Sequence, residues 1–258
     1  MSSILFEIKE QVACISLNRP DKLNSFNREM ALALQEALDK SATDKNIRAV
    51  YLTGAGKAFC AGQDLGEVTG DSPASFEVIL KEHYNPIIQR LRNLEKPVVC
   101  AVNGVAAGAG ANIALNCDIV VAKKSASFIQ AFSKIGLIPD SGGTFILPRL
   151  IGMQKATALM MLGDKVGADE AVSMGMIYKS FDDDVFEADS MKIAQQLSVM
   201  PTRGLALTKQ ALNAAMSNDL IAQLELEDKL QLKASASRDY HEGVAAFLEK
   251  RSPVFIGE

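Results

Sequence analysis

Two apolar runs, each leading into a loop of small residues, constrain the fold of this chain more than any other feature. The first run covers residues 47–53 and precedes Gly54-Ala55-Gly56, and the second covers 97–102 and precedes the Gly- and Ala-rich stretch 103–112. Short apolar runs bounded by turn residues are typical of buried strands, and the ligand loops of α/β proteins follow such strands. The pattern therefore predicts an α/β fold with a binding site at strand ends.

The rest of the chain continues this pattern and then becomes helical. Apolar or alternating segments predict further strands at 5–8, 12–17, 118–122, 127–129 and 177–181, and helical spacing predicts helices at 28–41, 75–93, 154–162 and 168–174. Ser25 and Asn27 are the candidate caps of the helix at 28–41. Residues 66–75, which are rich in Gly, Ser, Thr and Pro, are expected to form a mobile loop. We predict a core of residues 1–195 that carries the site, and a helical region of residues 196–258 whose apolar surface favours self-association.

Composition and charge argue against several classes of function. A net charge of −4 and a pI near 5.4 make nucleic acid an unsuitable main partner. The N-terminus has no basic segment followed by an apolar one, and no apolar run is long enough to span a bilayer, so we expect a cytoplasmic protein without a membrane partner. The four scattered cysteines form no C-x-x-C pair and are expected to be buried free thiols. No cluster has metal-ligand spacing, so no metal is expected.

The stretch 104–112 follows a predicted strand and begins a helix, but it is not a nucleotide-binding motif. It lacks both the G-x-G-x-x-G spacing and a Gly-Lys-Ser/Thr triplet. A helix whose first turn has almost no side chains presents unpaired N–H groups, which suit an anion or a carbonyl oxygen that gains charge during a reaction. The loop at Ala61-Gly62-Gln63 can supply a second donor to the same point. The alternative is that the small residues only allow a helix and a strand to pack closely.

Asp140 is the one ionisable side chain in the stretch 136–144, whose other residues are small or apolar. Few neighbours are available to solvate its charge, so its pKa should depend on the site, as an acid/base catalyst requires. The alternative is that Asp140 caps a helix that begins near Ser141, because Asp is a favoured N-cap residue. Considered without the glycine loops, the sequence favours the cap.

Four stretches together resemble the crotonase (enoyl-CoA hydratase/isomerase) superfamily, namely residues 59–65, 103–111, 136–144 and 240–251. The resemblance implies a spiral of strand-strand-helix units, a helical C-terminal region that forms trimers or pairs of trimers, and acyl-CoA thioester substrates. It implies no separate cofactor, because the substrate carries coenzyme A. It also implies an oxyanion hole formed by the backbone N–H groups of Gln63 and Ala109. The substrate-binding residues that it implies are Ala61, Gly62, Asp64, Leu65, Gly108, Gly110, Asn112, Phe132, Phe247 and Lys250, the last two by completing the pocket of a neighbouring copy.

Within this superfamily, hydratases use two glutamates, and the matching positions here are Asn112 and Phe132. Asp140 occupies a position where several isomerases place an acid, so the resemblance implies one carboxylate that moves one proton. Residues 131–143 most resemble the isomerases that convert 1,2-epoxyphenylacetyl-CoA to oxepin-CoA in phenylacetate degradation. This resemblance also implies a Δ3-to-Δ2 shift of the double bond in enoyl-CoA thioesters. The alternatives are an enoyl-CoA hydratase with displaced carboxylates and a non-catalytic CoA-binding homologue.

The remaining reactive side chains are expected to have no catalytic role. His83 and His241 are the only histidines, and both are predicted to lie on charged helical faces. Cys60 adjoins the first glycine loop, but it has no histidine nearby in the sequence, so packing is preferred over nucleophilic attack.

Overall fold

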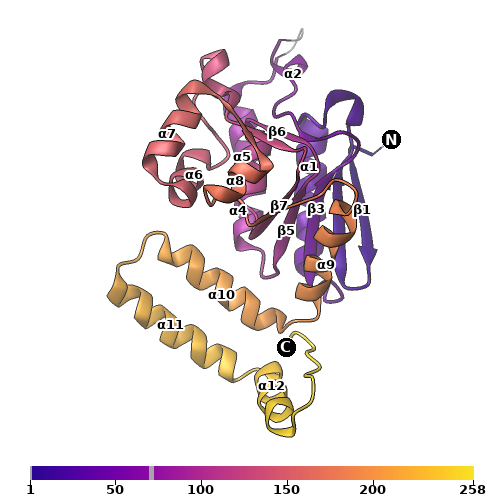
Figure 1. Cartoon of the computed structure of the whole chain (residues 1–258), viewed down its shortest axis with the longest axis vertical. Helices are drawn as coiled ribbons and strands as arrows, with labels where there is room; N and C mark the ends of the chain where they lie inside the picture. The colour runs from indigo at the N-terminus through magenta and orange to yellow at the C-terminus, as the bar shows by residue number, and fades with distance from the viewer. Residues whose placement is uncertain (1, 70–72) are drawn as a thin grey trace.

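The computed structural model describes residues 2–69 and 73–258, and its strands form two sheets (Figure 1). The larger sheet begins with an antiparallel hairpin, whose two strands are joined at Glu10 and Gln11, and continues with parallel strands only. Its strands, in spatial order, are β1 (Ile4–Lys9), β2 (Val12–Leu17), β3 (Ala49–Gly54), β5 (Val98–Val102), β7 (Ile119–Lys123) and β10 (Lys179–Phe181). The α/β architecture predicted from the sequence is confirmed.

The smaller sheet was only partly predicted. Its strands, in spatial order, are β4 (Ala58–Cys60), β6 (Val105–Ala107), β8 (Ser127–Ile129) and β9 (Lys165–Gly167). The sequence indicated loops at β4 and β6, because a strand of three residues is too short to show alternation. Since β4, β6 and β8 directly follow β3, β5 and β7, the chain repeats a unit of one strand from each sheet followed by helix.

The core helices cover both faces of the larger sheet (Figure 1). Helix α1 begins where Asn27 Oδ1 accepts from the N–H of Met30, so Asn27, and not Ser25, is its cap. Helix α9 packs on the opposite face through a separate apolar cluster that includes Tyr51, Val121 and Phe186. The core helices are α1 (Arg28–Thr43), α2 (Gly66–Thr69), α3 (Phe76–Val78), α4 (Asn85–Asn93), α5 (Ala109–Leu115), α6 (Gly143–Ile151), α7 (Met153–Leu162), α8 (Ala168–Ser173) and α9 (Phe186–Ser198).

Three expectations about residues 66–93 need correction. The expected mobile loop 66–75 contains the helix α2, and its residues 70–72 lie outside the described part of the chain. The predicted helix 75–93 contains a π-helical segment, Ile79–Tyr84, two residues before Pro86, which has no N–H to donate to the preceding turn. His83 lies in this segment with only 1% of its surface exposed, so its predicted place on a charged outer face is wrong. The segment turns His83 and Tyr84 inward.

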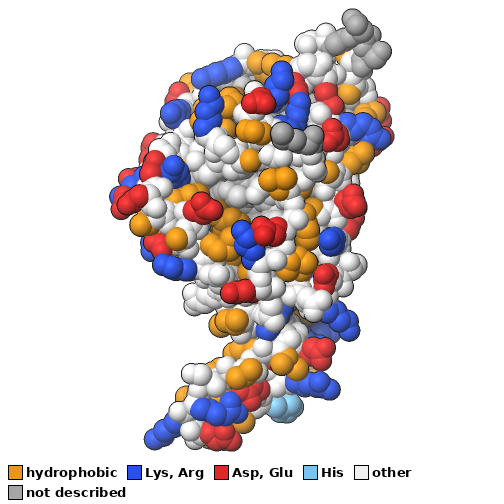
Figure 2. Space-filling model, turned by 90° about the vertical axis from the view of Figure 1, so that its right-hand side faces the viewer, with side chains coloured by type: hydrophobic (Ala, Val, Ile, Leu, Met, Phe, Trp, Pro, Cys, Tyr) orange, Lys and Arg blue, Asp and Glu red, His pale blue; other side chains and the backbone are white. Residues whose placement is uncertain are grey.

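Three helices form an extension beyond the core, α10 (Thr202–Ala215), α11 (Leu220–Ser235) and α12 (Arg238–Glu249) (Figure 1). Figure 2 shows this extension as a narrow arm on which charged and apolar side chains alternate. The chain end returns to α12, where the Asp239 carboxylate accepts from the N–H groups of Ile256 and Gly257. Large apolar side chains stay exposed on the arm, among them Leu232, Phe247 and Leu248. A role in self-association and the boundary near residue 195 stay predictions.

Within the described ranges, no helix has both the length and the apolar character needed to cross a bilayer.

Candidate active site

The two glycine loops leave the smaller sheet side by side, because β4 and β6 are parallel neighbours. The loop after β4 turns at Gly62, whose φ of +94° is unfavourable for other residues. A Cβ atom at Gly62 would lie 3.1 Å from the carbonyl oxygen of Ala107 and 3.8 Å from the backbone nitrogen of Ala109. The backbones of the two predicted donor loops are therefore in contact.

The backbone around Gln63 leaves one N–H group free on the side away from α1. Phe26 donates its N–H to the carbonyl of Gly62 (2.7 Å) and accepts from the N–H of Asp64 (2.8 Å). Since successive residues of an extended backbone point their N–H groups to opposite sides, the N–H of Gln63 points away from Phe26. Among the described residues, none accepts a hydrogen bond from it. Gln63 thus offers the donor that the sequence analysis assigned to it.

The second donor lies at the start of α5. Gly108 precedes this helix with φ 53° and ψ −127° and provides no side-chain cap, and the N–H of Ala109 has no acceptor within the described part of the chain. The first N–H groups of a helix have no intrahelical partner and carry its positive dipole end. Ala109 and Gln63 therefore belong to adjoining loops, each with a free N–H.

The glycines of this stretch also serve close packing, which was the alternative interpretation. A Cβ atom at Gly110 would lie 2.6 Å from both Cβ and the carbonyl oxygen of Cys60, and one at Gly104 would lie 2.2 Å from the carbonyl oxygen of Lys57. A Cβ atom at Gly108 would lie 3.7 Å from the Phe132 ring, an ordinary contact, so it is the φ of 53° that favours glycine there. Packing thus explains Gly104 and Gly110, while Ala109 keeps its N–H free.

Asp140 is not a helix cap. Helix α6 begins at Gly143, its N-cap is Gly142 with φ 72°, and no side chain caps it. The Asp140 carboxylate instead accepts a hydrogen bond from Ser141 Oγ at 2.9 Å. Burial raises the pKa of Asp140 from 3.8 to about 6, and the Ser141 hydrogen bond opposes this rise. A carboxyl group with this pKa can both take and return a proton near neutral pH.

Helix α5 holds the backbone of Asp140 in place. Asn112 Nδ2 donates to the carbonyl of Asp140 (2.8 Å), and Asn116 Nδ2, one turn later, donates to the carbonyl of Ser141 (3.0 Å). Gln130 Nε2 donates to Asn112 Oδ1 (2.8 Å), which fixes the orientation of the Asn112 amide. One short helix therefore carries the Ala109 donor at its start and positions the acid through Asn112, within the helix, and Asn116, its C-cap.

The hydrogen bonds from Asn112 and Asn116 to the Asp140 loop, here called the clamp, differ from the substrate contact predicted for Asn112. The side chain is fully buried, and both ends of its amide bind protein groups, so it supports the Asp140 loop. A Cβ atom at Gly143 would lie 2.3 Å from Asn112 Nδ2, so Gly143 makes room for the clamp. The sequence analysis missed the roles of Asn116 and Gln130. Two asparagines one turn apart on an otherwise apolar helix were the available signal.

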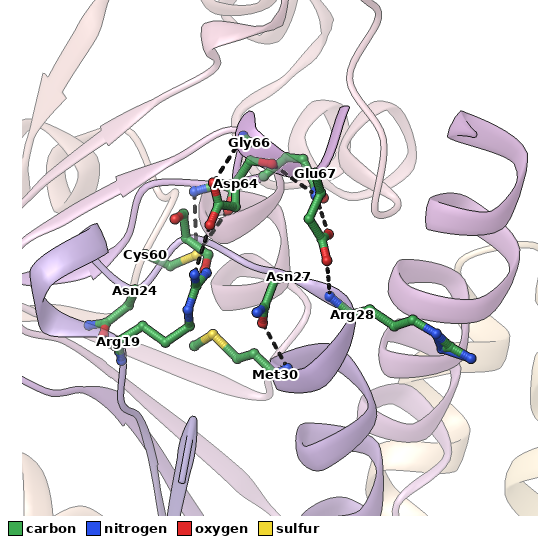
Figure 3. Close-up of polar contacts among 12 residues, drawn as sticks. Arg19, Asn24, Asn27, Arg28, Met30, Cys60, Asp64, Gly66 and Glu67 are labelled. Atoms are coloured by element: carbon green, nitrogen blue, oxygen red, sulfur yellow. Dashed lines mark hydrogen bonds and ion pairs between the residues drawn. The ribbon is translucent and has the colours of Figure 1, made fainter. Parts of the chain in front are cut away.

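The remaining residues near the first loop have structural contacts of their own (Figure 3). Asp64 accepts from Arg19 Nη2 (2.8 Å) and from the N–H of Gly66 (3.1 Å), and the Arg19 hydrogen bond lowers the pKa of Asp64. Ala61 donates its N–H to the carbonyl of Leu23 (2.9 Å). Leu65 has 56% of its surface exposed and can contact a ligand. A ligand contact of each of these residues stays a prediction.

Phe247 and Lys250 do not join the site within one copy of the chain. They lie at the end of α12, in the extension, whereas the glycine loops lie in the core (Figure 1). Phe247 is 83% exposed and lines an apolar cavity of about 440 Å³ with Leu248 and Phe255. Their contribution to the pocket of a neighbouring copy stays a prediction.

Cys60 is buried beneath the first turn of α5, and burial raises the pKa of its thiol to about 12. A thiol with this pKa is almost fully protonated at neutral pH and cannot serve as a nucleophile. No group of three or more His, Cys, Asp or Glu side chains in residues 2–69 and 73–258 is placed to hold a metal ion.

Comparison with known proteins gives consistent matches along nearly the whole chain. The family model described as "Enoyl-CoA hydratase/isomerase" matches residues 7–258. The 1,2-epoxyphenylacetyl-CoA isomerase of Escherichia coli (strain K12) is 49% identical, with 100% of both chains covered. A "Probable enoyl-CoA hydratase" of Rhodobacter capsulatus is 45% identical, covering 99% of this chain and 98% of that protein. The crystal structure of an enoyl-CoA hydratase from Bacillus anthracis matches with a TM-score of 0.93 and 33% identity, covering 99% of this chain and 100% of that one.

Proposed function

This chain belongs to the enoyl-CoA hydratase/isomerase family, the crotonase superfamily, and from that premise we propose that it is an acyl-CoA isomerase. Its preferred reaction, in this proposal, converts ring-1,2-epoxyphenylacetyl-CoA to oxepin-CoA, and it also shifts double bonds from Δ3 to Δ2 in enoyl-CoA thioesters. The observation that carries the proposal is Asp140, a single carboxyl group with a pKa raised to about 6, clamped by the helix that begins at Ala109. The match to solved structures confirms the fold expected from the sequence.

The free N–H groups of Gln63 and Ala109 polarise the thioester carbonyl in the proposed mechanism. Each donor strengthens its hydrogen bond as the oxygen becomes an enolate, so it stabilises the transition state more than the bound substrate. Asp140 in its ionised form takes the proton from the carbon next to the carbonyl, and the electron pair moves into the enolate. A free donor on each of two adjoining loops supports this role.

The same Asp140 then returns the proton to a different carbon, so the overall composition of the substrate does not change. In the double-bond shift, the proton leaves C2 and returns to C4, and the double bond moves from C3–C4 to C2–C3. For the ring epoxide, the bond between the two epoxide carbons breaks, its electrons enter the shifted ring double bonds, and the oxygen becomes part of a seven-membered ring. The proton taken from the carbon next to the carbonyl returns to a ring carbon. A pKa near neutrality favours both proton transfers, because the group is neither fully protonated nor weakly basic at pH 7.

An assay with three substrates tests the proposal. The purified protein is incubated separately with ring-1,2-epoxyphenylacetyl-CoA, a Δ3-enoyl-CoA and crotonyl-CoA, and the products are separated by chromatography. We expect the first two to be isomerised and crotonyl-CoA to be hydrated slowly or not at all, because Asn112 and Phe132 cannot act as bases. Hydration with a turnover above roughly 10 s⁻¹ would favour the hydratase alternative, and CoA-ester binding without turnover would favour the non-catalytic one.

We also propose that the chain assembles into trimers or pairs of trimers. The extension exposes large apolar side chains, including Phe247 and Leu248, that a stable monomer would rarely leave in water. In the trimer, Phe247 and Lys250 would approach the acyl-CoA of a neighbouring copy, with Lys250 close to a phosphate. Light scattering at micromolar concentration should give a mass of three or six chains, and a monomer would contradict the proposal.

A further inference from the structure

Tyr84 is a buried side chain that contacts the donor loop but carries none of the proposed chemistry. It ends the π-helical segment Ile79–Tyr84, and only 1% of its surface is exposed. Its Oη donates a hydrogen bond to Gln63 Oε1 at 2.7 Å. π-Helical turns are uncommon and occur frequently at functional sites. Here the turn brings a phenol hydroxyl under the residue whose backbone N–H is a proposed oxyanion donor.

The Gln63 amide is held at both ends. While Oε1 accepts from Tyr84, Nε2 donates to Glu67 Oε2 at 2.9 Å. Glu67 Oε1 in turn accepts from the N–H of Arg28 at 2.7 Å, at the start of α1 (Figure 3). Because a tyrosine hydroxyl and a carboxylate require opposite ends of an amide, only one orientation of the Gln63 side chain satisfies both partners.

The Gln63 backbone is anchored to the same cluster. The residues on either side of Gln63 bind the N–H and the carbonyl of Phe26. The Phe26 ring packs edge-on against Tyr84, with 5.9 Å between ring centroids and an interplanar angle of 72°. Burial, followed by the nearby Cys60 and Asp140, raises the pKa of Tyr84 well above 10, so its hydroxyl stays a donor throughout the working pH range.

We propose that Tyr84 is a positioning residue that aims the backbone N–H of Gln63 at the substrate oxygen. Through its hydroxyl, Tyr84 fixes the rotation of the Gln63 side chain, and through Phe26 it supports the backbone on either side of that residue. The proposal rests on the proposed function, since it assigns a support to the oxyanion donor of that same site. A donor that loses this support remains present but samples directions in which it contributes less to the transition state.

Tyr84→Phe is the decisive variant, because it removes only the hydroxyl and retains the buried ring. We expect kcat to fall by about 5- to 50-fold with little change in KM, less than the ~10²–10³ that follows complete loss of an oxyanion donor. Tyr51→Phe is the matched control, since Tyr51 is also buried and its hydroxyl shares a 2.8 Å hydrogen bond with Ser190 on the far side of the sheet. Tyr51→Phe should leave kcat unchanged.

A double-mutant cycle tests whether Tyr84 acts through Gln63. Gln63→Met retains the length of the side chain but cannot form either hydrogen bond. If Tyr84 acts through the Gln63 amide, the losses of Tyr84→Phe and Gln63→Met should not add in the double variant. Additive losses, or a Tyr84→Phe enzyme with unchanged kcat, would overturn the proposal.

Hydrogen exchange of the ligand-free protein separates this proposal from the proposed function. The N–H groups of Ala61 and Asp64 flank Gln63 and are protected by hydrogen bonds to Leu23 and Phe26. Tyr84→Phe should accelerate exchange in peptides that cover 60–67, whereas Tyr51→Phe should not. If the wild type acts on no CoA thioester, the proposed function fails, and the exchange alone decides whether Tyr84 positions Gln63. Unchanged exchange in that segment would refute the positioning role.

Discussion

Replacing Asp140 by asparagine removes a partly buried charge while retaining the size of the side chain and an oxygen for the hydrogen bond from Ser141. The folded protein holds the Asp140 proton more tightly than the unfolded chain does, because burial raises the pKa from 3.8 to about 6. Each pKa unit corresponds to ~1.4 kcal/mol, so the ionised carboxylate lowers the free energy of unfolding by ~3 kcal/mol at most.

Because the ionised Asp140 carboxylate lowers the free energy of unfolding, the stability of the wild type should depend on pH. The destabilisation is absent below pH 3.8, where Asp140 is protonated in both states, and it is fully present above about pH 6. Asp140→Asn should therefore unfold at a higher temperature than the wild type at pH 7 to 8, and the difference should shrink as the pH falls towards 4. A structural cap would behave differently, because asparagine caps a helix about as well as aspartate, so the substitution would then change stability little at any pH.

Asp140→Asn should lower activity although it raises stability. The asparagine variant cannot accept a proton, so kcat should fall by ~10²–10⁴, the range typical of a lost general base. In the wild type, Asp140 is about nine-tenths ionised at pH 7 and about one-tenth at pH 5, so kcat/KM, which follows the ionisation of the free enzyme, should rise with pH through a midpoint near 6. The measurements are thermal unfolding and isomerase turnover from pH 4.5 to 8. A folded variant with near-wild-type turnover, or one less stable at pH 8, would refute the reasoning.

Two further substitutions test the surroundings of this acid. Ser141→Gly removes the hydroxyl that lowers the pKa of Asp140, so the midpoint of the pH–rate profile should move upward. Glycine also adopts the φ of 51° found at this position without strain, so thermal stability should not fall. A downward move of the midpoint would contradict this prediction. Gly143→Ala places a Cβ atom 2.3 Å from Asn112 Nδ2, so it should lower the free energy of unfolding by ~1–3 kcal/mol and should also lower kcat. Gly167→Ala is the control, because a Cβ atom there has nothing within 4 Å and should change neither quantity. Denaturant unfolding and turnover measure the two effects.

The sequence alone determined those features that depend on neighbouring residues. The buried strands at 49–54 and 98–102 were predictable because apolar runs between turn residues have few alternatives. The Asn27 cap could be proposed from residue type alone, although Ser25 was an equal candidate. Asp140 was identifiable as a solitary acid in an apolar stretch, and the resemblance of four stretches to the crotonase superfamily indicated the family.

Only the tertiary structure decided what those residues do, because the deciding contacts join distant segments. The residues around Asp140 favoured capping over catalysis, but α6 begins at Gly143 without a side-chain cap. Asn112 supports the acid across 28 positions of sequence, and no local pattern encodes that hydrogen bond. The pKa of about 6 likewise arises from burial, which depends on the packing of remote segments. The inward turn of Tyr84 depends on a π-helical segment that periodicity does not predict.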